Sequence, residues 1–337
     1  MSTVVMTGGT SGFGAIAAER LVRSGGARLI LGARRPAPAG ESVPLDLARL
    51  ESVRTFAASL RDRLGGAPVH ALVLNAGVIR PDATGRTADG FETTFAVNHL
   101  AHYLLLRLLL PALADRAAVV LTSSGTHDPA TGAGPAPPRH ADAGLLAHPD
   151  RDPGLDPRAR TAGEQAYTAS KLCTVLTARS LSAHPDARSR RLTVIAYDPG
   201  QVFGTGLAQN LSLPLRTAWS LLGTPVLGWP LRRFSATLNS RTAAGGALAD
   251  LAAGRAAPRT ERSTPPCGGG GSPGRPPRRR PATTDSPKRC GTTAPGWSAC
   301  RTDASHGKRR SPGEVLPVPS CARLLGPSSS GLRPPPR

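Results

Sequence analysis

A short apolar run that leads into a glycine-rich turn and then a helix constrains the fold of this chain more than any other feature. The run Thr3–Met6 has strand character, the turn reads Thr7-Gly8-Gly9-Thr10-Ser11-Gly12-Phe13-Gly14, and the predicted helix covers Gly14–Ser24. Glycines at such a turn let the backbone approach a pyrophosphate, whose charge the helix N-terminus stabilises. The context predicts a dinucleotide site rather than an ordinary tight turn.

The alternation of apolar strand and helix continues to about residue 254. We expect strands at Arg28–Gly32, Val69–Leu74, Ala117–Thr122 and Leu192–Tyr197, and helices at Ser52–Leu64, Phe95–Leu113 and Tyr167–Ser182. Strands that are apolar throughout lie in a parallel sheet covered by helices on both faces. The pattern predicts a single α/β domain over residues 1–254, a Rossmann-type doubly wound parallel sheet whose ligand binds beyond the carboxyl ends of the strands.

Two arginines follow the second predicted strand. Arg34 and Arg35 stand where an acidic residue would accept hydrogen bonds from the ribose hydroxyls of NAD. An arginine instead pairs with the 2′-phosphate of NADP. We therefore predict NADP(H) as the cofactor, with Arg34 as the first contact and Arg35 as the second; two solvated surface arginines are the alternative.

Several polar residues occur where this fold places an active site. Ser124 follows the strand Ala117–Thr122, and Asn98 lies in the long predicted helix. Tyr167 and Lys171 are four residues apart, so both lie on one face of their helix. Each residue alone is more typical of a turn or a surface, but the whole set in this order indicates catalysis.

These motifs together resemble the classical short-chain dehydrogenase/reductase family over about residues 3–254. The resemblance lies in the glycine turn, Asn75-Ala76-Gly77, Asn98, Ser124, the Tyr-x-x-x-Lys at 167–171 and Asp198-Pro199-Gly200. The sequences AVNHLAHYLL at 96–105 and YTASKLC at 167–173 resemble the retinol dehydrogenase and protochlorophyllide reductase branch of that family.

The resemblance implies NADPH-dependent hydride transfer between nicotinamide and the carbonyl or alcohol of a small molecule. Tyr167 would be the general acid/base, and Lys171 would lower its pKa and hold the nicotinamide ribose. Ser124 would donate a hydrogen bond to the substrate oxygen, and Asn98 would support a water that connects Lys171 to solvent. The segment 206–234 takes the place of the substrate lid, and its leucines and tryptophans indicate an apolar substrate, although core packing explains them equally well.

The same resemblance implies the cofactor contacts. Asp46 and Leu47 would lie at the adenine, Pro199-Gly200 would bring backbone beside the nicotinamide, and Thr205 would bind the carboxamide or a phosphate. The expected contacts are Gly8, Thr10, Ser11, Gly12, Phe13, Gly14, Arg34, Asp46, Leu47, Asn75, Ala76, Gly77, Tyr167, Lys171, Pro199, Gly200 and Thr205.

The stretch between Ser124 and Tyr167 is longer than the family usually has. Its part Ala130–Gly163 is rich in Pro, Gly, Asp, Arg and His, and we interpret it as an inserted loop over the substrate mouth. A metal site is the alternative interpretation, but no ligand spacing supports it, and we expect no metal. Its candidate ligands are His127, His140 and His148.

The segment 255–337 differs from the rest in composition. Its 16 Lys and Arg against 4 Asp and Glu give it +12 of the net charge of +20, and it holds four of the five cysteines. It has too few large apolar residues to form a core, so we expect a disordered basic tail. Only Cys173 lies in the body, which favours a reducing cytoplasm. We expect no signal peptide, and the apolar run Leu104–Ala114 is too short for a membrane span.

The family places a last strand after the helix that ends near Ala253, and the sequence offers none. A shift of two bases in GC-rich codons for Ser286–Trp297 permits an amphipathic helix, Ala-Glu-Ala-Leu-Trp-Asp-Asp-Cys-Ala-Arg-Leu. Our hypothesis is that the tail after about Ala256 is a frameshift product, which sequencing the gene would test. The alternative is a basic arm whose clusters at 278–280 and 308–310 bind nucleic acid or anionic membrane without specificity.

Two further functions remain open. A catalytically inactive cofactor-binding remnant that lacks the last sheet strand would carry the same motifs. A sugar epimerase shares the Tyr and Lys pair, but it usually carries a TGxxGxxG turn that is absent here. The resemblance also implies homodimers paired through long helices, and no specific nucleic-acid partner is expected.

Overall fold

The computed structural model describes residues 1–203, 217, 238–255 and 298–301. These residues form one seven-stranded sheet with the strand order β3-β2-β1-β4-β5-β6-β7. The strands are β1 Ser2–Thr7, β2 Ala27–Ala33, β3 Glu41–Pro44, β4 Val69–Leu74, β5 Leu113–Thr122, β6 Thr193–Asp198 and β7 Ser298–Arg301. Strands β1 to β6 are all parallel, which confirms the predicted doubly wound sheet.

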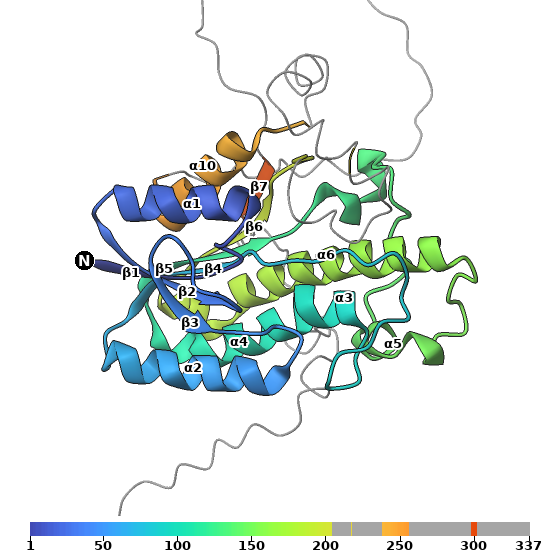
Figure 1. Ribbon diagram of the computed structural model, residues 1–337, viewed down its shortest axis with the longest axis horizontal. Coiled ribbons are helices and arrows are strands. Elements are labelled where there is room, and N and C mark those ends of the chain that lie inside the picture. The colour runs from blue at the N-terminus through green and yellow to red at the C-terminus, as the bar shows by residue number, and fades with distance from the viewer. Residues whose placement is uncertain (204–216, 218–237, 256–297, 302–337) are drawn as a thin grey trace, which may run out of the picture.

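Helices cover both faces of the sheet (Figure 1). The longer ones are α1 Gly12–Arg23, α2 Leu50–Leu64, α4 Ala101–Leu109, α6 Ala159–Ala183 and α10 Arg241–Ala252. The shorter α-helices are α3 Thr93–Phe95, α5 Ala143–Ala147 and α7 Pro185–Ser189. A π-helix, η1, covers Ala96–Leu100, and the 3-10 helices are η2 Leu110–Ala112, η3 Gly125–His127, η4 Pro129–Thr131 and η5 Pro149–Arg151.

The strands alternate their side chains between two apolar cores, as the period of two dictates. Val5 and Ile30 face the core formed with α2, α4 and α6, whereas Val4 and Met6 face the core formed with α1 and α10. Because apolar residues occupy both faces, the strands read in the sequence as continuous apolar runs.

Close backbone packing holds α10 on α1. A Cβ atom at Gly245 would lie 2.5 Å from the carbonyl oxygen of Phe13 and 2.8 Å from Cβ of Ile16. The hydroxyl of Tyr197 on β6 donates to the carbonyl of Ala244 at 2.9 Å. Helix α10 therefore fixes the start of α1, where the glycine turn ends.

The predicted helix Phe95–Leu113 is a composite of four helical segments, α3, η1, α4 and η2, and strand β5 already begins at Leu113. By length and composition Thr93–Ala112 passes as a membrane span, but 72% of its most apolar window is buried inside the protein. Such burial is that of a core helix.

The interpretation of Ala130–Gly163 as a loop is wrong in part. The segment contains α5 and η5, and α6 begins at Ala159, well before the predicted start at Tyr167. Apolar periodicity alone did not reveal this extension, because its first turns carry Arg160, Thr161 and Glu164.

The tail contributes a strand that the sequence did not indicate. Strand β7 pairs with β6 in antiparallel orientation, with Ala299 opposite Tyr197 and Cys300 opposite Ala196 (Figure 1). The expectation that no strand follows the helix ending near Ala253 is thus corrected. Apart from Arg255, the remaining tail residues, including both basic clusters, lie outside the described residues.

Candidate active site

Four parallel strands end side by side where the predicted site residues lie. Strand β1 leads into the glycine turn, β4 into Asn75, β5 into Ser123 and Ser124, and β6 into Pro199. Strands β1 and β4 are neighbours although they are not consecutive, so the topological switch point lies between them. The carboxyl ends of these strands therefore gather the site at one edge of the sheet.

The glycine turn is a cradle that side chains would fill. Gly8 has a φ of +69°, and a Cβ there would lie 2.7 Å from the Cα of Ala76. A Cβ at Gly14 would overlap the carbonyl oxygen of Gly8. Ser11, the N-cap of α1, makes no side-chain capping bond. The turn and the helix N-terminus thus fit a phosphate group, the anion that such N–H groups bind.

Hydrogen bonds hold the segment Asn75-Ala76-Gly77 against this turn. The Thr7 hydroxyl oxygen accepts from the backbone N–H groups of Asn75 at 3.0 Å and Ala76 at 3.2 Å. The Asn75 amide donates to the carbonyl of Gly8 at 3.1 Å and accepts from the Thr122 hydroxyl at 3.0 Å. The ends of β1, β4 and β5 are therefore bonded to one another.

The residues expected at the adenosine end lie after β2 and β3. Arg34 and Arg35 are exposed, and neither forms an ion pair within the part of the chain that the structure describes. The carboxylate of Asp46 accepts from the backbone N–H of Ala48 at 3.0 Å, and Leu47 is buried. The two guanidinium groups are available to an anion.

Tyr167 and Lys171 are buried together on α6, as their spacing predicts. The Lys171 ammonium lies 5.7 Å from the centre of the Tyr167 ring and donates to the carbonyl of Thr122 at 3.0 Å. Ser124 caps η3, and its hydroxyl accepts from the Thr126 hydroxyl at 3.1 Å. Ser123 instead points inward and donates to the carbonyl of Lys171 at 3.0 Å. Of the serine pair, Ser124 is the one whose hydroxyl interacts with the Tyr167 side chain.

Asn98 lies in the π-helix, where it joins two further segments. Its amide accepts from the N–H of Val78 at 2.8 Å and donates to the carbonyl of Val78 at 3.0 Å and to the Ser170 hydroxyl at 3.1 Å. A Cβ at Gly77 would lie 3.4 Å from Oδ1 of Asn98 and 3.6 Å from Nζ of Lys171. The structure therefore brings Asn98 and Lys171 together beside Gly77.

Burial shifts both titrating groups toward their neutral forms. Burial raises the pKa of Tyr167 to about 12; the Ser124 hydroxyl lowers this pKa, and the Asp198 carboxylate raises it. Burial lowers the pKa of Lys171 to about 8, against the opposing effect of Asp198. Burial thus keeps the phenol of Tyr167 protonated at neutral pH, and the lowering of this pKa by Lys171 stays a prediction.

Asp198 is a site residue that the sequence named only as part of a motif. Its carboxylate accepts from the N–H of Gly200 at 2.9 Å and lies 2.8 Å from where a Cβ of Gly125 would be. Its carboxylate raises the pKa of both Tyr167 and Lys171, so it lies close to this pair. A carboxylate at the end of an apolar strand was the available signal.

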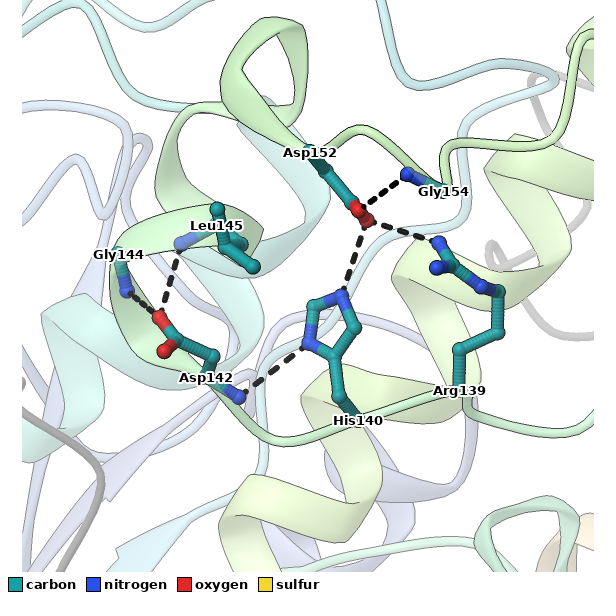
Figure 2. Close-up of polar contacts among 7 residues, drawn as sticks. All are labelled: Arg139, His140, Asp142, Gly144, Leu145, Asp152 and Gly154. Atoms are coloured by element: carbon teal, nitrogen blue, oxygen red, sulfur yellow. Dashed lines mark hydrogen bonds and ion pairs between the residues drawn. The ribbon is translucent and has the colours of Figure 1, made fainter.

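The segment between Ser124 and Tyr167 is held by a buried carboxylate (Figure 2). Asp152 accepts from Nη1 of Arg139 at 2.8 Å, Nε2 of His140 at 3.0 Å and the N–H of Gly154 at 2.9 Å. Burial raises the pKa of Asp152, but these bonds outweigh burial and hold the pKa at about 2. His140 is thus engaged by Asp152, and the described residues contain no group of three potential metal ligands.

The residues expected beside the nicotinamide lie in the turn after β6. Gly200 has a φ of +70°, and the carbonyl of Pro199 accepts from the Asn239 amide at 2.9 Å, which orients the turn after β6. Thr205 and, apart from Thr217, the segment 206–234 lie outside the described residues.

Known proteins resemble this chain in sequence. The family model for short chain dehydrogenase matches residues 2–133. Polyprenol dehydrogenase of Mus musculus is 35% identical over 246 residues, covering 67% of each chain. Protochlorophyllide reductase A of Oryza sativa subsp. japonica is 33% identical over 229 residues, which cover 60% of this chain and 58% of that protein. The chain therefore spans a little more than half of the rice enzyme.

Solved structures show the same fold. The 3-alpha-hydroxysteroid dehydrogenase from Pseudomonas sp. B-0831, solved in complex with NADH, superposes with a TM-score of 0.50 at 26% identity over 74% of this chain and 89% of that one. Enzymes of this family are oxidoreductases that bind nicotinamide cofactors. The fold, the ordered motifs and the identity to the mouse enzyme establish that the chain belongs to the short-chain dehydrogenase/reductase family, in its retinol dehydrogenase and protochlorophyllide reductase-like branch.

Proposed function

We propose that the protein is an NADPH-dependent oxidoreductase that transfers a hydride between nicotinamide and the carbonyl or alcohol of an apolar small molecule. The observation that carries the proposal is the buried pair of Tyr167 and Lys171 beside Ser124, at the edge of the sheet where the glycine cradle opens. The names of two relatives, a polyprenol dehydrogenase and a protochlorophyllide reductase, support an apolar substrate.

Each side chain has a separate task in the reduction. Bound NADPH supplies the hydride. Tyr167 donates the proton to the developing alkoxide, since its raised pKa keeps the phenol protonated across neutral pH. Ser124 donates a hydrogen bond to the same oxygen. The ammonium of Lys171 lies beside the ring of Tyr167 and stabilises the phenolate that forms.

A water beside Asn98 would restore the proton that Tyr167 gives up, by passing a proton from solvent through the Lys171 ammonium to the phenolate. The Asn98 amide lies beside Gly77 together with Nζ of Lys171, where such a water would connect the ammonium to solvent. In the direction of alcohol oxidation the same groups act in reverse, with Tyr167 as the base.

The replacement Tyr167→Phe tests this chemistry. The variant keeps the ring that packs in the core but loses the acidic proton, so NADPH binding stays and turnover falls by about 10²- to 10⁴-fold, the range for loss of a general acid. Binding is followed by nicotinamide fluorescence, and turnover by loss of NADPH absorbance with a panel of apolar aldehydes and ketones. Unchanged turnover in this variant contradicts the assignment.

Arg34 tests the choice of cofactor. Because this exposed guanidinium lacks an ion-pair partner within the described residues, it is free for a 2′-phosphate. Arg34→Ala is expected to weaken NADPH binding by about tenfold or more, the size of a lost charged hydrogen bond, without changing NADH binding. Arg35→Ala is the matched control with a smaller effect. Equal affinity of the unaltered protein for NADPH and NADH would exclude the proposed preference.

A further inference from the structure

His102 is a buried histidine that the proposed chemistry does not use. It lies on α4, one helical turn after Asn98, and its side chain is 5% exposed. Its Nε2 is 2.9 Å from the hydroxyl oxygen of Thr7, and its Nδ1 is 3.1 Å from the carbonyl oxygen of Asn98. The ring therefore spans the distance between the strand that starts the glycine turn and the helix that carries Asn98.

The neighbours of the ring fix its tautomer. The Thr7 oxygen has two lone pairs, and the N–H groups of Asn75 and Ala76 occupy both. The Thr7 hydroxyl hydrogen must then be donated to Nε2 of His102. Because Nε2 accepts, Nδ1 carries the ring hydrogen and donates it to the carbonyl of Asn98.

Only the neutral ring satisfies all of these bonds, since a charged ring has no acceptor for Thr7. Burial lowers the pKa of His102 to about 4; its bond to Asn98 opposes this, and the charge of Lys171 adds to it. The neighbouring His99 is also buried, and its pKa is lowered to about 3. The two hydrogen bonds of the His102 ring, to Thr7 and to the Asn98 carbonyl, form a bridge that therefore persists across neutral pH.

The bridge connects the cofactor cradle with the part of the site that contains Lys171. On one side, Thr7 holds Asn75 and Ala76, and the Asn75 amide holds the carbonyl of Gly8 in the cofactor cradle. On the other side, the Asn98 amide holds Ser170, which precedes Lys171. His102 thus links the cradle to the helix that supports the catalytic lysine.

We propose that His102 is a positioning residue. Its ring, in the Nδ1–H tautomer, ties the glycine cradle and the Asn75 segment to the Asn98 carbonyl. These bonds fix the position of the bound cofactor relative to the catalytic Lys171. The inference rests on the proposed function for the roles of Asn98 and Lys171. The bridge itself depends only on the contacts of His102.

The tautomer can be measured on the unaltered protein. Long-range ¹H–¹⁵N NMR correlations of the His102 ring, assigned by comparison with His102→Gln, are expected to show Nδ1 protonated and Nε2 as an acceptor, without titration between pH 5 and 8. A ring protonated at Nε2, or one that titrates in this range, overturns the proposal. This measurement does not depend on whether a substituted chain folds.

Substitution tests the consequence. His102→Leu leaves the Thr7 hydroxyl without its acceptor, so we expect NADPH binding, followed by nicotinamide fluorescence, to weaken by about tenfold or more, the effect of an unsatisfied buried donor. The turnover number falls as well. His102→Gln, which retains an acceptor and a donor, recovers part of both losses.

His99→Leu is the matched control. His99 lies on the same helical run, is equally buried and contacts the rings of Phe95 and Tyr103. Its replacement is expected to lower the urea midpoint but to leave NADPH affinity within twofold. Equal losses of affinity in the His99 and His102 variants overturn the proposal. If the unaltered protein reduces no carbonyl, yet His102→Leu alone weakens NADPH binding, the proposed function fails and the bridge stands.

Discussion

Lys171 places a cation in the interior of the protein, where its ammonium donates to the carbonyl of Thr122 at 3.0 Å. Burial lowers its pKa to about 8 from an ordinary value of 10.5. Below pH 8 the group is charged in both the folded and the unfolded chain, and the folded chain carries the desolvation cost. Between pH 8 and 10.5 the unfolded chain binds more protons, so stability rises with pH.

Lys171→Met is therefore expected to stabilise the protein while it removes turnover. Methionine fills the same space without a charge, and the gain at pH 7 is about 1–2 kcal/mol after the loss of the bond to Thr122 is subtracted. Urea unfolding at pH 7 and pH 10 measures the unaltered protein and the variant without cofactor. The difference between their free energies of unfolding should shrink at the higher pH. A variant less stable than the unaltered protein at pH 7 would show that the ammonium stabilises the fold.

For single residues, the sequence predicted those whose position follows from local spacing. The interval from Tyr167 to Lys171 is one helical turn, and Ser124 follows a strand, so both positions could be read without coordinates. His102 and Asp198 could not be assigned a role in this way. Their partners, Thr7 for one and the Tyr167 and Lys171 pair for the other, are distant in the sequence.

Among the elements, α6 carries Tyr167 and Lys171 and is anchored at its first turns. A Cβ at Gly163 would lie 2.7 Å from the N of Asp82, 2.8 Å from the carbonyl carbon of Pro81 and 2.9 Å from the carbonyl oxygen of Arg80. These atoms belong to the backbone and cannot rotate away. Helix α6 is therefore fixed at Gly163, one turn before Tyr167.

Gly163→Ala is expected to destabilise the protein by about 1–3 kcal/mol, because either α6 or the segment 80–82 must move. Turnover should fall with it, since Tyr167 lies on the same helix. Gly134→Ala is the matched control in the same inserted segment: Gly134 has open space around its Cα, so its replacement changes stability by about 0.5 kcal/mol or less. Urea midpoints and initial rates of both variants decide, and equal effects would refute the anchoring of α6.

The sequence predicts the bounds of some elements and gives no sign of others. Strand β4 was predicted to the residue because its side chains are apolar except for His70, and because Pro68 and Asn75 flank it. The π-helix at Ala96–Leu100 leaves no trace in the apolar pattern, since its side chains are buried like those of α4. Strand β7 has no apolar signature, and its place in the sheet comes from backbone pairing with β6.

At the scale of the whole molecule, the basic tail adds the last strand of the sheet. Four of its residues pair with Ile195, Ala196, Tyr197 and Asp198 on β6. Without β7, the backbone of β6 would form a sheet edge next to the candidate site, and exposed edges lose stability and promote association. The frameshift hypothesis for the tail stays a prediction, which determination of the coding sequence decides.

A chain ended after Arg255 is accordingly expected to unfold at lower urea concentration than the full chain and to associate as its concentration rises. Proline in place of Ala299 or Cys300 separates pairing from the rest of the tail. Alternate residues of an antiparallel strand donate to its partner, so one of these two prolines removes a ladder bond and the other is the control. Light scattering and urea unfolding of all four chains measure the outcome. If the shortened chain matches the full one in both, β7 adds nothing to the sheet, and residues 1–255 alone account for the fold.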